Sequence, residues 1–213
     1  MELTGLNDYY IWRYDEDGNL LTDEAAGGLA TNCSKAGIFI VNLASSYGAT
    51  QANITGLAPT AQKVYGSNAV AEQQVGAVNP QVALAANDIP HLIYDNFAGL
   101  KKDQLGGYGK KDNFLVRGGV IVHSKNANKN IDLYMAFPYG VFTPGEMNLQ
   151  TNQENPTVVH DALTFAAQER PSDMLLYEKF YSDEKDFDLD KMISYITGTI
   201  KENITPTKPS TNA

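Results

Sequence analysis

The sequence predicts a mainly β (α+β) fold, in which a β-sandwich or part-barrel is flanked by a short middle helix and a C-terminal helix. Short β-branched apolar runs bounded by turn residues recur along the chain, two runs in its second half alternate with a period of two, and helical spacing occurs at two places. The 213 residues suit one sizeable domain with its own core, so we expect a single domain over residues 1–213.

The first 35 residues are rich in turns, and we expect them to form an N-terminal arm. YDEDGNLL predicts two short extended pieces around the Asp17-Gly18 turn. Asp15, Asp17 and Asn19 have the spacing of a calcium loop, but Gly18 comes too early and no Glu closes the ring. A hairpin is the better interpretation.

A buried strand is predicted from Gly37, where GIFIVNLA is short and β-branched. The polar stretch over residues 47–66 has no sustained apolar period and predicts a long loop. Because such a loop is unusual in a compact domain, it favours a partner that it contacts. VGAVNPQVALAAND predicts an extended strand with a bulge or an exposed edge at Pro80.

A helix is predicted in IPHLIYDNFAG, with Asp88 as its cap and Gly99 at its end. Its apolar residues recur at helical spacing: Ile89, Leu92, Ile93 and Phe97. The basic loop LKKDQLGGYGKKDN follows, and it lacks the glycine spacing of a phosphate-binding or dinucleotide-binding motif.

The clearest strands lie in the second half. VRGGVIVHS places Val116, Val120 and Val122 on one face, and NIDLYMAF alternates in the same way from Ile131 to Phe137. Two longer extended stretches, VFTPGEMNLQTNQE and TVVHDALTFAAQE, meet near Asn155-Pro156, and MLLYEKFYS predicts a final strand. FDLDKMISYITGTI predicts the C-terminal helix, and residues 199–213 predict a flexible tail.

The composition limits the possible functions. Twenty-five acidic against sixteen basic residues give a formal charge of −9, which argues against gripping nucleic acid by its phosphates, although the protein could enclose DNA. The single cysteine, Cys33, cannot form an intrachain disulfide, and the N-terminus lacks the features of a secretory signal. These features indicate synthesis in a reducing cytoplasm. No run approaches eighteen apolar residues, so we expect no membrane span.

Patterns for catalysis are weak. There is no G-x-S-x-G elbow, and Cys33 lies in an ordinary polar context. His160 and Asp161 would point to opposite faces of a strand, so they cannot form one site. We expect that the protein is not an enzyme and that it binds no cofactor.

Three groups that contain acidic residues are conceivable sites. Asp88, His91 and Asp95 could share a helix face, but they make a thin metal shell. The pairs Glu178/Asp183 and Asp186/Asp188 could act as acid and base, yet acidic runs are usually a solvated surface. We expect no metal.

The succession LIYDNFAG, VRGGVIVHS, IDLYMAFPYGVFTPGEMNLQTNQE and VVHDALTFAAQER, over residues 89–170, resembles the major tail tube proteins of siphoviruses that infect Gram-positive bacteria. The most distinctive part is AFPYGVF, which leads into a Gln/Asn/Thr-rich strand and then to ALTF. The resemblance implies a structural β-sandwich subunit that forms hexameric rings, stacked into a tube around the lumen. It also implies that a long loop reaches a neighbouring ring, and the candidates here are Tyr47, Pro59 and Tyr65.

The same resemblance implies the partners and the location. The subunit would contact other copies of itself, the tape measure protein, and the tail terminator and distal tail proteins. Double-stranded DNA would pass through during genome ejection without specific binding. The protein would lie in the virion tail after assembly in the host cytoplasm.

The residues support this interpretation independently. FTPGEMNLQTNQE lacks a continuous apolar face, so on a monomer it would be an under-buried edge, and closure between subunits removes that edge. A negative lumen would repel phosphates and let the genome slide. The candidates to face the bore are Glu146, Glu154, Asp161 and Glu169.

The alternative of another class is a carbohydrate-binding β-sandwich. Five aromatic residues could stack on sugars: Tyr9, Tyr10, Trp12, Tyr134 and Tyr139. They are scattered along the chain, and tyrosines in β proteins are commonly core or interface residues. An enzyme that uses the carboxylate pairs is a third hypothesis.

Overall fold

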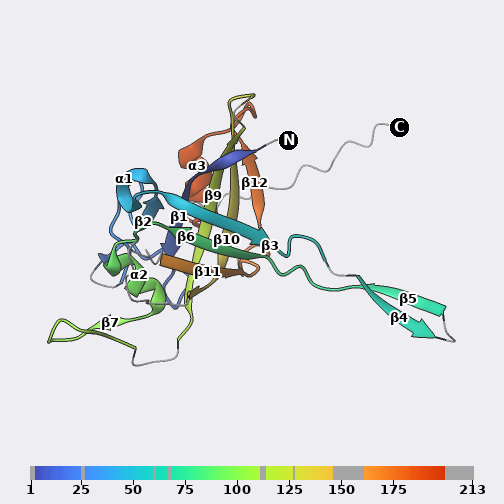
Figure 1. Cartoon of the computed structure of the whole chain (residues 1–213), viewed down its shortest axis with the longest axis horizontal. Coiled ribbons are helices and arrows are strands. Elements are labelled where there is room, and N and C mark those ends of the chain that lie inside the picture. The colour runs from blue at the N-terminus through green and yellow to red at the C-terminus, as the bar shows by residue number, and fades with distance from the viewer. Residues whose placement is uncertain are drawn as a thin grey trace, which may run out of the picture.

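The computed structural model describes residues 3–24, 27–59, 61–66, 69–110, 114–126, 128–145 and 161–199 (Figure 1). The strands are β1 (Thr4–Arg13), β2 (Ile38–Val41), β3 (Ala49–Thr55), β4 (Ala61–Gly66), β5 (Ala69–Val75), β6 (Gln81–Ala86), β7 (Lys101–Lys102), β8 (Tyr108–Gly109), β9 (Val116–Asn126), β10 (Ile131–Pro144), β11 (Asp161–Ala167) and β12 (Glu178–Tyr181). The helices are α1 (Leu43–Ser46), α2 (His91–Ala98) and α3 (Leu189–Ile196). The predicted class, mainly β with flanking helices, is confirmed.

One antiparallel sheet of eight strands forms the body, in the order β2-β1-β9-β10-β11-β6-β3, with β12 also paired to β10. The 14-residue strand β10 runs along β9 on one side. On its other side, Leu133 to Ala136 pair with β12 and Gly140 to Pro144 pair with β11. A Cβ at Gly140 would lie 2.5 Å from Phe165 Cζ, so only glycine fits where the sheet divides.

Two apolar cores cover opposite faces of β1, β9 and β10. Alternate residues of β9 and β10, such as Val120 and Phe137, enter the first core, which α2 covers. Ile121 and Ala136 enter the second core, which contains the buried face of α3. The predicted shared face of Val116, Val120 and Val122 is confirmed, since all three lie in the first core.

Residues 4–13, within the segment expected as an N-terminal arm, form the strand β1. This strand lies between β2 and β9, with Tyr9 and Ile11 in the first core and Trp12 in the second. Burial of both faces produces a continuous apolar run that has no period-two signal. The predicted hairpin at Asp17-Gly18 is confirmed, because Tyr14 bridges to Leu20 across that turn.

The prediction of a long loop over residues 47–66 is wrong, because the strands β3 and β4 lie within this segment. The predicted strand at Gly37 is confirmed as β2, and Asn42 then caps α1 through a capping box with Ser45. The β4–β5 hairpin projects far from the body in Figure 1. The extended strand predicted over residues 75–88 is interrupted, since β6 begins directly after Pro80.

The middle helix is confirmed as α2, although its N-cap is Pro90 and not Asp88. Asp88 instead donates its backbone N–H to Ser46 O. Leu92 is half-exposed and lies outside the buried face, whereas Gly99 ends the helix in the left-handed conformation as predicted. The glycine-rich loop that follows contains the short β7–β8 ribbon.

The C-terminal helix is confirmed as α3, capped by Asp188, whose side chain accepts a hydrogen bond from Lys191 N. The final strand β12 is shorter than predicted and begins at Glu178. Arg170 donates to the carbonyl oxygens of Tyr195 and Ile196, at the last turn of α3. None of the described helices has the length and apolar character needed to cross a bilayer.

Candidate functional site

The outward face of β3, β6 and β11 is a continuous surface of small uncharged side chains. The strand registers arrange these residues in three rows across the sheet. The rows are Gln51–Ala85–Ala162, Asn53–Ala83–Thr164 and Thr55–Gln81–Ala166. We call this set the neutral face, and its members are exposed or half-buried.

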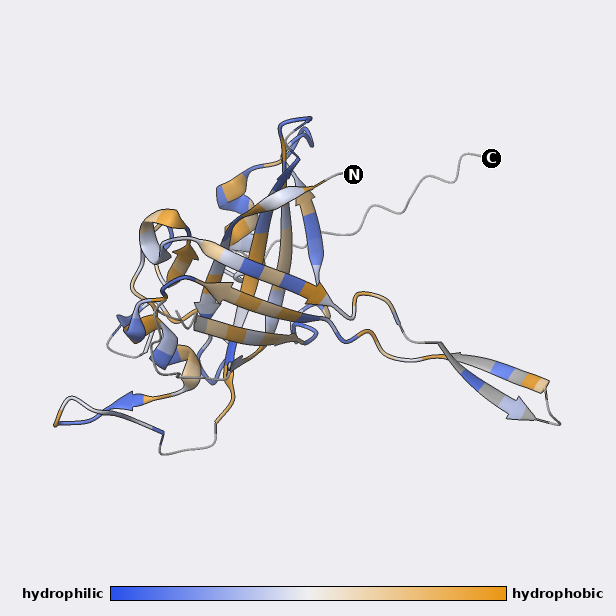
Figure 2. Cartoon of the chain, viewed as in Figure 1, coloured by the Kyte–Doolittle hydropathy of each residue, from blue (hydrophilic) through white to orange (hydrophobic). Residues whose placement is uncertain are grey.

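The neutral face follows from strand alternation. The residues between its members, including Val82, Leu84 and Phe165, are buried in the first core. Hydrophilic and hydrophobic residues therefore alternate along β3 in Figure 2. The face continues on β10, where Thr143 lies opposite Thr164 and donates its hydroxyl to Thr164 O at 3.3 Å.

Amides, hydroxyls and methyl groups are the only chemistry that this surface offers. None of its members is an acid, a base or an aromatic residue, so it can neither form an ion pair with phosphate nor titrate near neutral pH. In the described part of the chain, β3 ends the strand path and pairs only with β6. Its outer edge can therefore accept a strand from another chain.

A second polar group joins β1, β9 and β10 on another part of the sheet. His123 Nδ1 lies 3.1 Å from Asp8 Oδ1, and His123 Nε2 lies 3.3 Å from Asp132 Oδ1. Burial lowers the pKa of His123, but the two carboxylates together outweigh burial and raise it. The ring stacks on Tyr134 with 4.4 Å between centroids. Since the two nitrogens point away from each other toward different carboxylates, the group is a clamp between strands.

A model of the phage tail tube protein family matches residues 1–204. The chain belongs to the phage tail tube protein family. No curated protein matches it. The match includes the first 88 residues, which the resemblance noted above did not cover.

Membership of this family gives the general role of the tail tube protein. It is a structural subunit of the phage virion tail, and it assembles with other copies of itself into a tube. The family is a structural one, which agrees with the expectation of a protein that is not an enzyme.

Neither of the two described acidic candidates for the bore is a member of the neutral face. Asp161 opens β11, where its backbone pairs with Ala86, and Glu169 is exposed two residues after β11 ends. Glu146 and Glu154 lie outside the described residues. The two described positions are thus at opposite ends of β11.

The three candidates for the inter-ring loop belong to different segments of the tail tube protein. Tyr47 follows α1 in the left-handed conformation, with φ of 50°. Pro59 lies between β3 and β4, and Tyr65 lies on β4 in the projecting hairpin. All three are exposed, but β3 separates Tyr47 from the other two.

The aromatic residues proposed as sugar-stacking faces are part of the interior. Tyr9, Tyr10, Trp12 and Tyr134 are each at most 7% exposed. Tyr139 is half-buried, with its ring centroid 5.8 Å from that of Tyr14. A sugar ring cannot reach these faces, so the structure offers the carbohydrate-binding alternative no surface made of these residues.

The carboxylate candidates, all of which lie in the described part of the chain, do not gather into a metal site. Among the described residues, no group of His, Cys, Asp and Glu could hold a metal ion, and this includes Asp88, His91 and Asp95. Burial raises the pKa of Glu178, whereas its proposed partner Asp183 is exposed. Asp188 is engaged as the cap of α3.

Sequence reasoning missed both the neutral face and the His123 clamp. The neutral face is assembled from strands that lie far apart in the chain, and the clamp depends on Asp8 lying opposite His123. The signal available in the sequence was the low charge of three segments, ATQANIT, QVALAA and DALTFAA. Only the register of the strands shows that these segments form one surface.

Proposed function

We propose that this tail tube protein forms hexameric rings that stack into the tube of a siphovirus tail, and that the tube conducts the genome during ejection. The observation that carries the proposal is the neutral face, a surface three strands wide on which no side chain is charged. We assign this face to the wall of the bore.

A wall of this kind suits a passing polyanion. Lysine or arginine would bind phosphates and release counterions, which would hold the DNA in place. Alanine, threonine, asparagine and glutamine contact water and DNA without that attraction. The open edge of β3 would be closed by the adjacent subunit, so that strands from all subunits form one barrel.

The acidic candidates are proposed as flanks of this wall. Asp161 and Glu169 stand at the two ends of β11, and they would repel phosphates at the margins of the neutral face. Glu146 and Glu154 are proposed for the same role. Repulsion at the margins and neutrality between them would both favour sliding.

The β4–β5 hairpin is proposed as the element that reaches a neighbouring ring. It projects from the body (Figure 1), and it carries the exposed apolar residues Tyr65, Val70 and Val75. Exposed apolar side chains on a projecting ribbon are typical of a surface that a partner covers. Tyr47 and Pro59 are proposed as further contacts at that junction.

The remaining partners follow from this role. The tape measure protein would occupy the bore before DNA does, and the terminator and distal tail proteins would close the two ends. DNA would pass without specific binding. We place assembly in the cytoplasm of a Gram-positive host.

The proposal is tested by placing positive charge on the neutral face. The purified chain should form sixfold rings or tubes by electron microscopy. Virions carrying Thr164→Lys should retain intact tubes yet eject DNA more slowly, and the delay should be larger at low salt, where phosphate attraction is least screened. Thr164→Gln adds length without charge and is the matched control.

Two results would contradict the proposal. A wild-type chain that stays monomeric at high concentration would exclude the ring. Intact Thr164→Lys tubes that eject DNA as fast as the glutamine control would show that this face does not line the bore.

A further inference from the structure

The β7–β8 ribbon presents one apolar side chain at its tip. Leu105 is 96% exposed. The tip is ordered by Asp103, whose carboxylate accepts hydrogen bonds from Leu105 N at 2.9 Å and from Gly107 N at 2.7 Å. A further hydrogen bond from Asp103 N to Gly107 O closes the turn. The leucine is therefore held outward on a defined turn, at a large cost in exposed apolar surface.

The flanks of the ribbon are basic. Lys101, Lys102 and Lys110 are exposed, and Asp103 is engaged within the turn. This is a local positive surface in a chain whose formal charge is −9. An apolar residue framed by lysines fits an apolar recess with an acidic margin.

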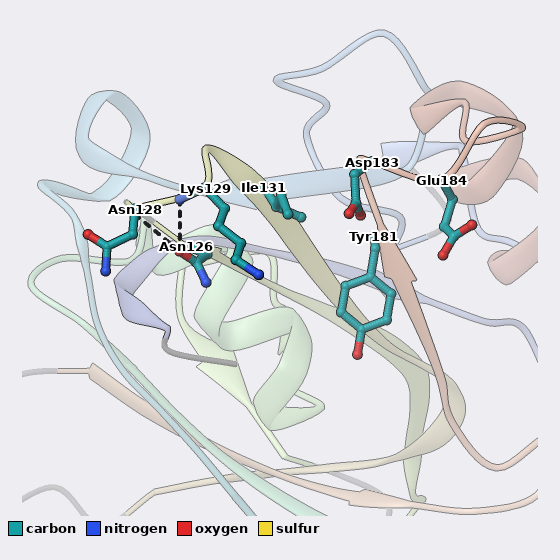
Figure 3. A pocket seen from close by; sticks show the side chains of 7 residues that line it. All are labelled: Asn126, Asn128, Lys129, Ile131, Tyr181, Asp183 and Glu184. Carbon is teal, nitrogen blue, oxygen red and sulfur yellow. Dashed lines mark hydrogen bonds between the residues drawn. The ribbon is translucent and has the colours of Figure 1, made fainter.

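A pocket with two apolar and two acidic side chains among its seven lining residues lies at the far end of β9. Its volume is about 520 Å³, and it is formed between the β9–β10 turn and the end of β12 (Figure 3). Ile131 and Tyr181 supply its apolar lining, while Asp183 and Glu184 supply acidic groups. Lys129 also lines the pocket, and Asn126 holds the turn by accepting hydrogen bonds from backbone N–H groups at 128 and 129.

The ribbon and the pocket lie at opposite ends of the body. The ribbon precedes β9 in the chain, and the pocket begins at the last residue of β9. Eleven residues of strand span about 35 Å, at about 3.3 Å per residue. Figure 1 shows the same separation, with the β7 ribbon at the lower left and the β9–β10 turn at the top. The ribbon cannot fill the pocket of its own chain.

We propose that the tip of the β7–β8 ribbon docks into the pocket between the β9–β10 turn and β12 of a second copy of this chain. Leu105 enters between Ile131 and Tyr181, and the ribbon lysines face Asp183 and Glu184. The contact joins two different patches, so it is heterologous and repeats from copy to copy, as a ring or a filament requires. It rests on the proposed function, because it supplies one of the contacts within the tube.

Cross-linking tests the contact directly. The full-length variant Leu105→Cys/Asp183→Cys, made with Cys33→Ser, is assembled and treated with a short bismaleimide. We expect a ladder of covalently joined chains. Variants that carry only one of the two new cysteines should give no ladder beyond a dimer, and unchanged thermal unfolding would show that they fold.

A charge exchange tests its energetics. Leu105→Glu and Lys102→Glu should raise the concentration needed for tube assembly, the former about tenfold or more, because an anchor residue leaves its pocket. Lys102→Glu combined with Asp183→Lys should restore much of the loss. Lys191→Glu, exposed on α3 and outside the pocket lining, is the matched control and should assemble as the wild type does.

The outcomes separate this contact from the proposed function. The contact is overturned if tubes form normally but give no cross-linked ladder, or if Leu105→Glu does not change the concentration needed for assembly. Either result leaves the tube role intact. A wild-type chain that forms no ring or tube overturns both.

Discussion

Replacing Gly119 by alanine should destabilise the fold, because this position has no room for a side chain. Gly119 lies on β9 directly opposite Trp12 of β1. An added Cβ would lie 2.6 Å from Trp12 Cε2, nearer still to Cζ2, and 2.7 Å from Pro138 O. Carbon atoms in contact are normally about 3.5–4.0 Å apart, so the indole would have to move by about an ångström. Trp12 is fully buried in the second core, which leaves little space for that movement.

The size of the effect follows from two opposing contributions. Overpacking of a core costs about 1–3 kcal/mol, and this contact lies at the upper end. Alanine restricts the unfolded chain more than glycine does, which returns about 0.4–1 kcal/mol. We expect a net loss of about 2 kcal/mol. For a chain of this size, that corresponds to a fall in Tm of about 4–8 °C.

Thermal unfolding followed by circular dichroism and by tryptophan fluorescence measures the change. Trp12 is the only tryptophan, so its emission reports on this contact. Gly109→Ala is the matched control, since a Cβ there meets no atom within 4 Å, and it should change the free energy of unfolding by less than about 0.5 kcal/mol. An alanine at 119 with wild-type Tm and wild-type emission would refute the packing of β1 against β9 described above.

Two further predictions concern the polar contacts. The pKa of His123 is raised in the folded state, so its pairing with Asp8 and Asp132 stabilises the fold below about pH 6.5 and is lost as pH rises through the folded-state pKa. The difference in unfolding free energy between wild type and His123→Gln should therefore shrink from pH 6 to pH 9 in urea titrations, and a constant difference would contradict the clamp. Arg170→Met removes the hydrogen bonds to the last turn of α3 and the ion pair with Asp173. In the same titrations it should lower the free energy of unfolding by about 3 kcal/mol. The control Lys179→Met, at an exposed position, should leave that free energy nearly unchanged.

The parts of the fold that the sequence predicted are those in which apolar residues recur at a visible period. Val116, Val120 and Val122 alternate with other residues, and Met192, Ile193 and Ile196 recur at helical spacing, so both patterns are visible without coordinates. The strand β1 is buried on both faces and has no such period. In β3, inward residues such as Ala52 are small, so they differ little in hydropathy pattern from outward residues such as Asn53, and the alternation is hard to see in the sequence.

The candidate site was harder to predict because it depends on register. Asn53, Ala83 and Thr164 are neighbours only after β3, β6 and β11 pair. The sequence pointed to acidic residues as candidates for the bore and left this surface unnoticed, since charges are conspicuous in a sequence and an uncharged surface is not. Asp8 and His123 are likewise separated by 115 positions, and only the antiparallel pairing of β1 with β9 brings them together.

The division of β10 between two partners has a mechanical consequence. One strand, β10, is hydrogen-bonded to β12 along Leu133–Ala136 and to β11 along Gly140–Pro144, and β9 pairs with both portions across a register shift between Phe137 and Gly140. A load along β10 acts in shear on all of these hydrogen bonds together, which is the stiff direction of a β-sheet. We therefore expect the sheet of each subunit to resist a load along β10, so that a tail that bends would take up its curvature at the joints between subunits.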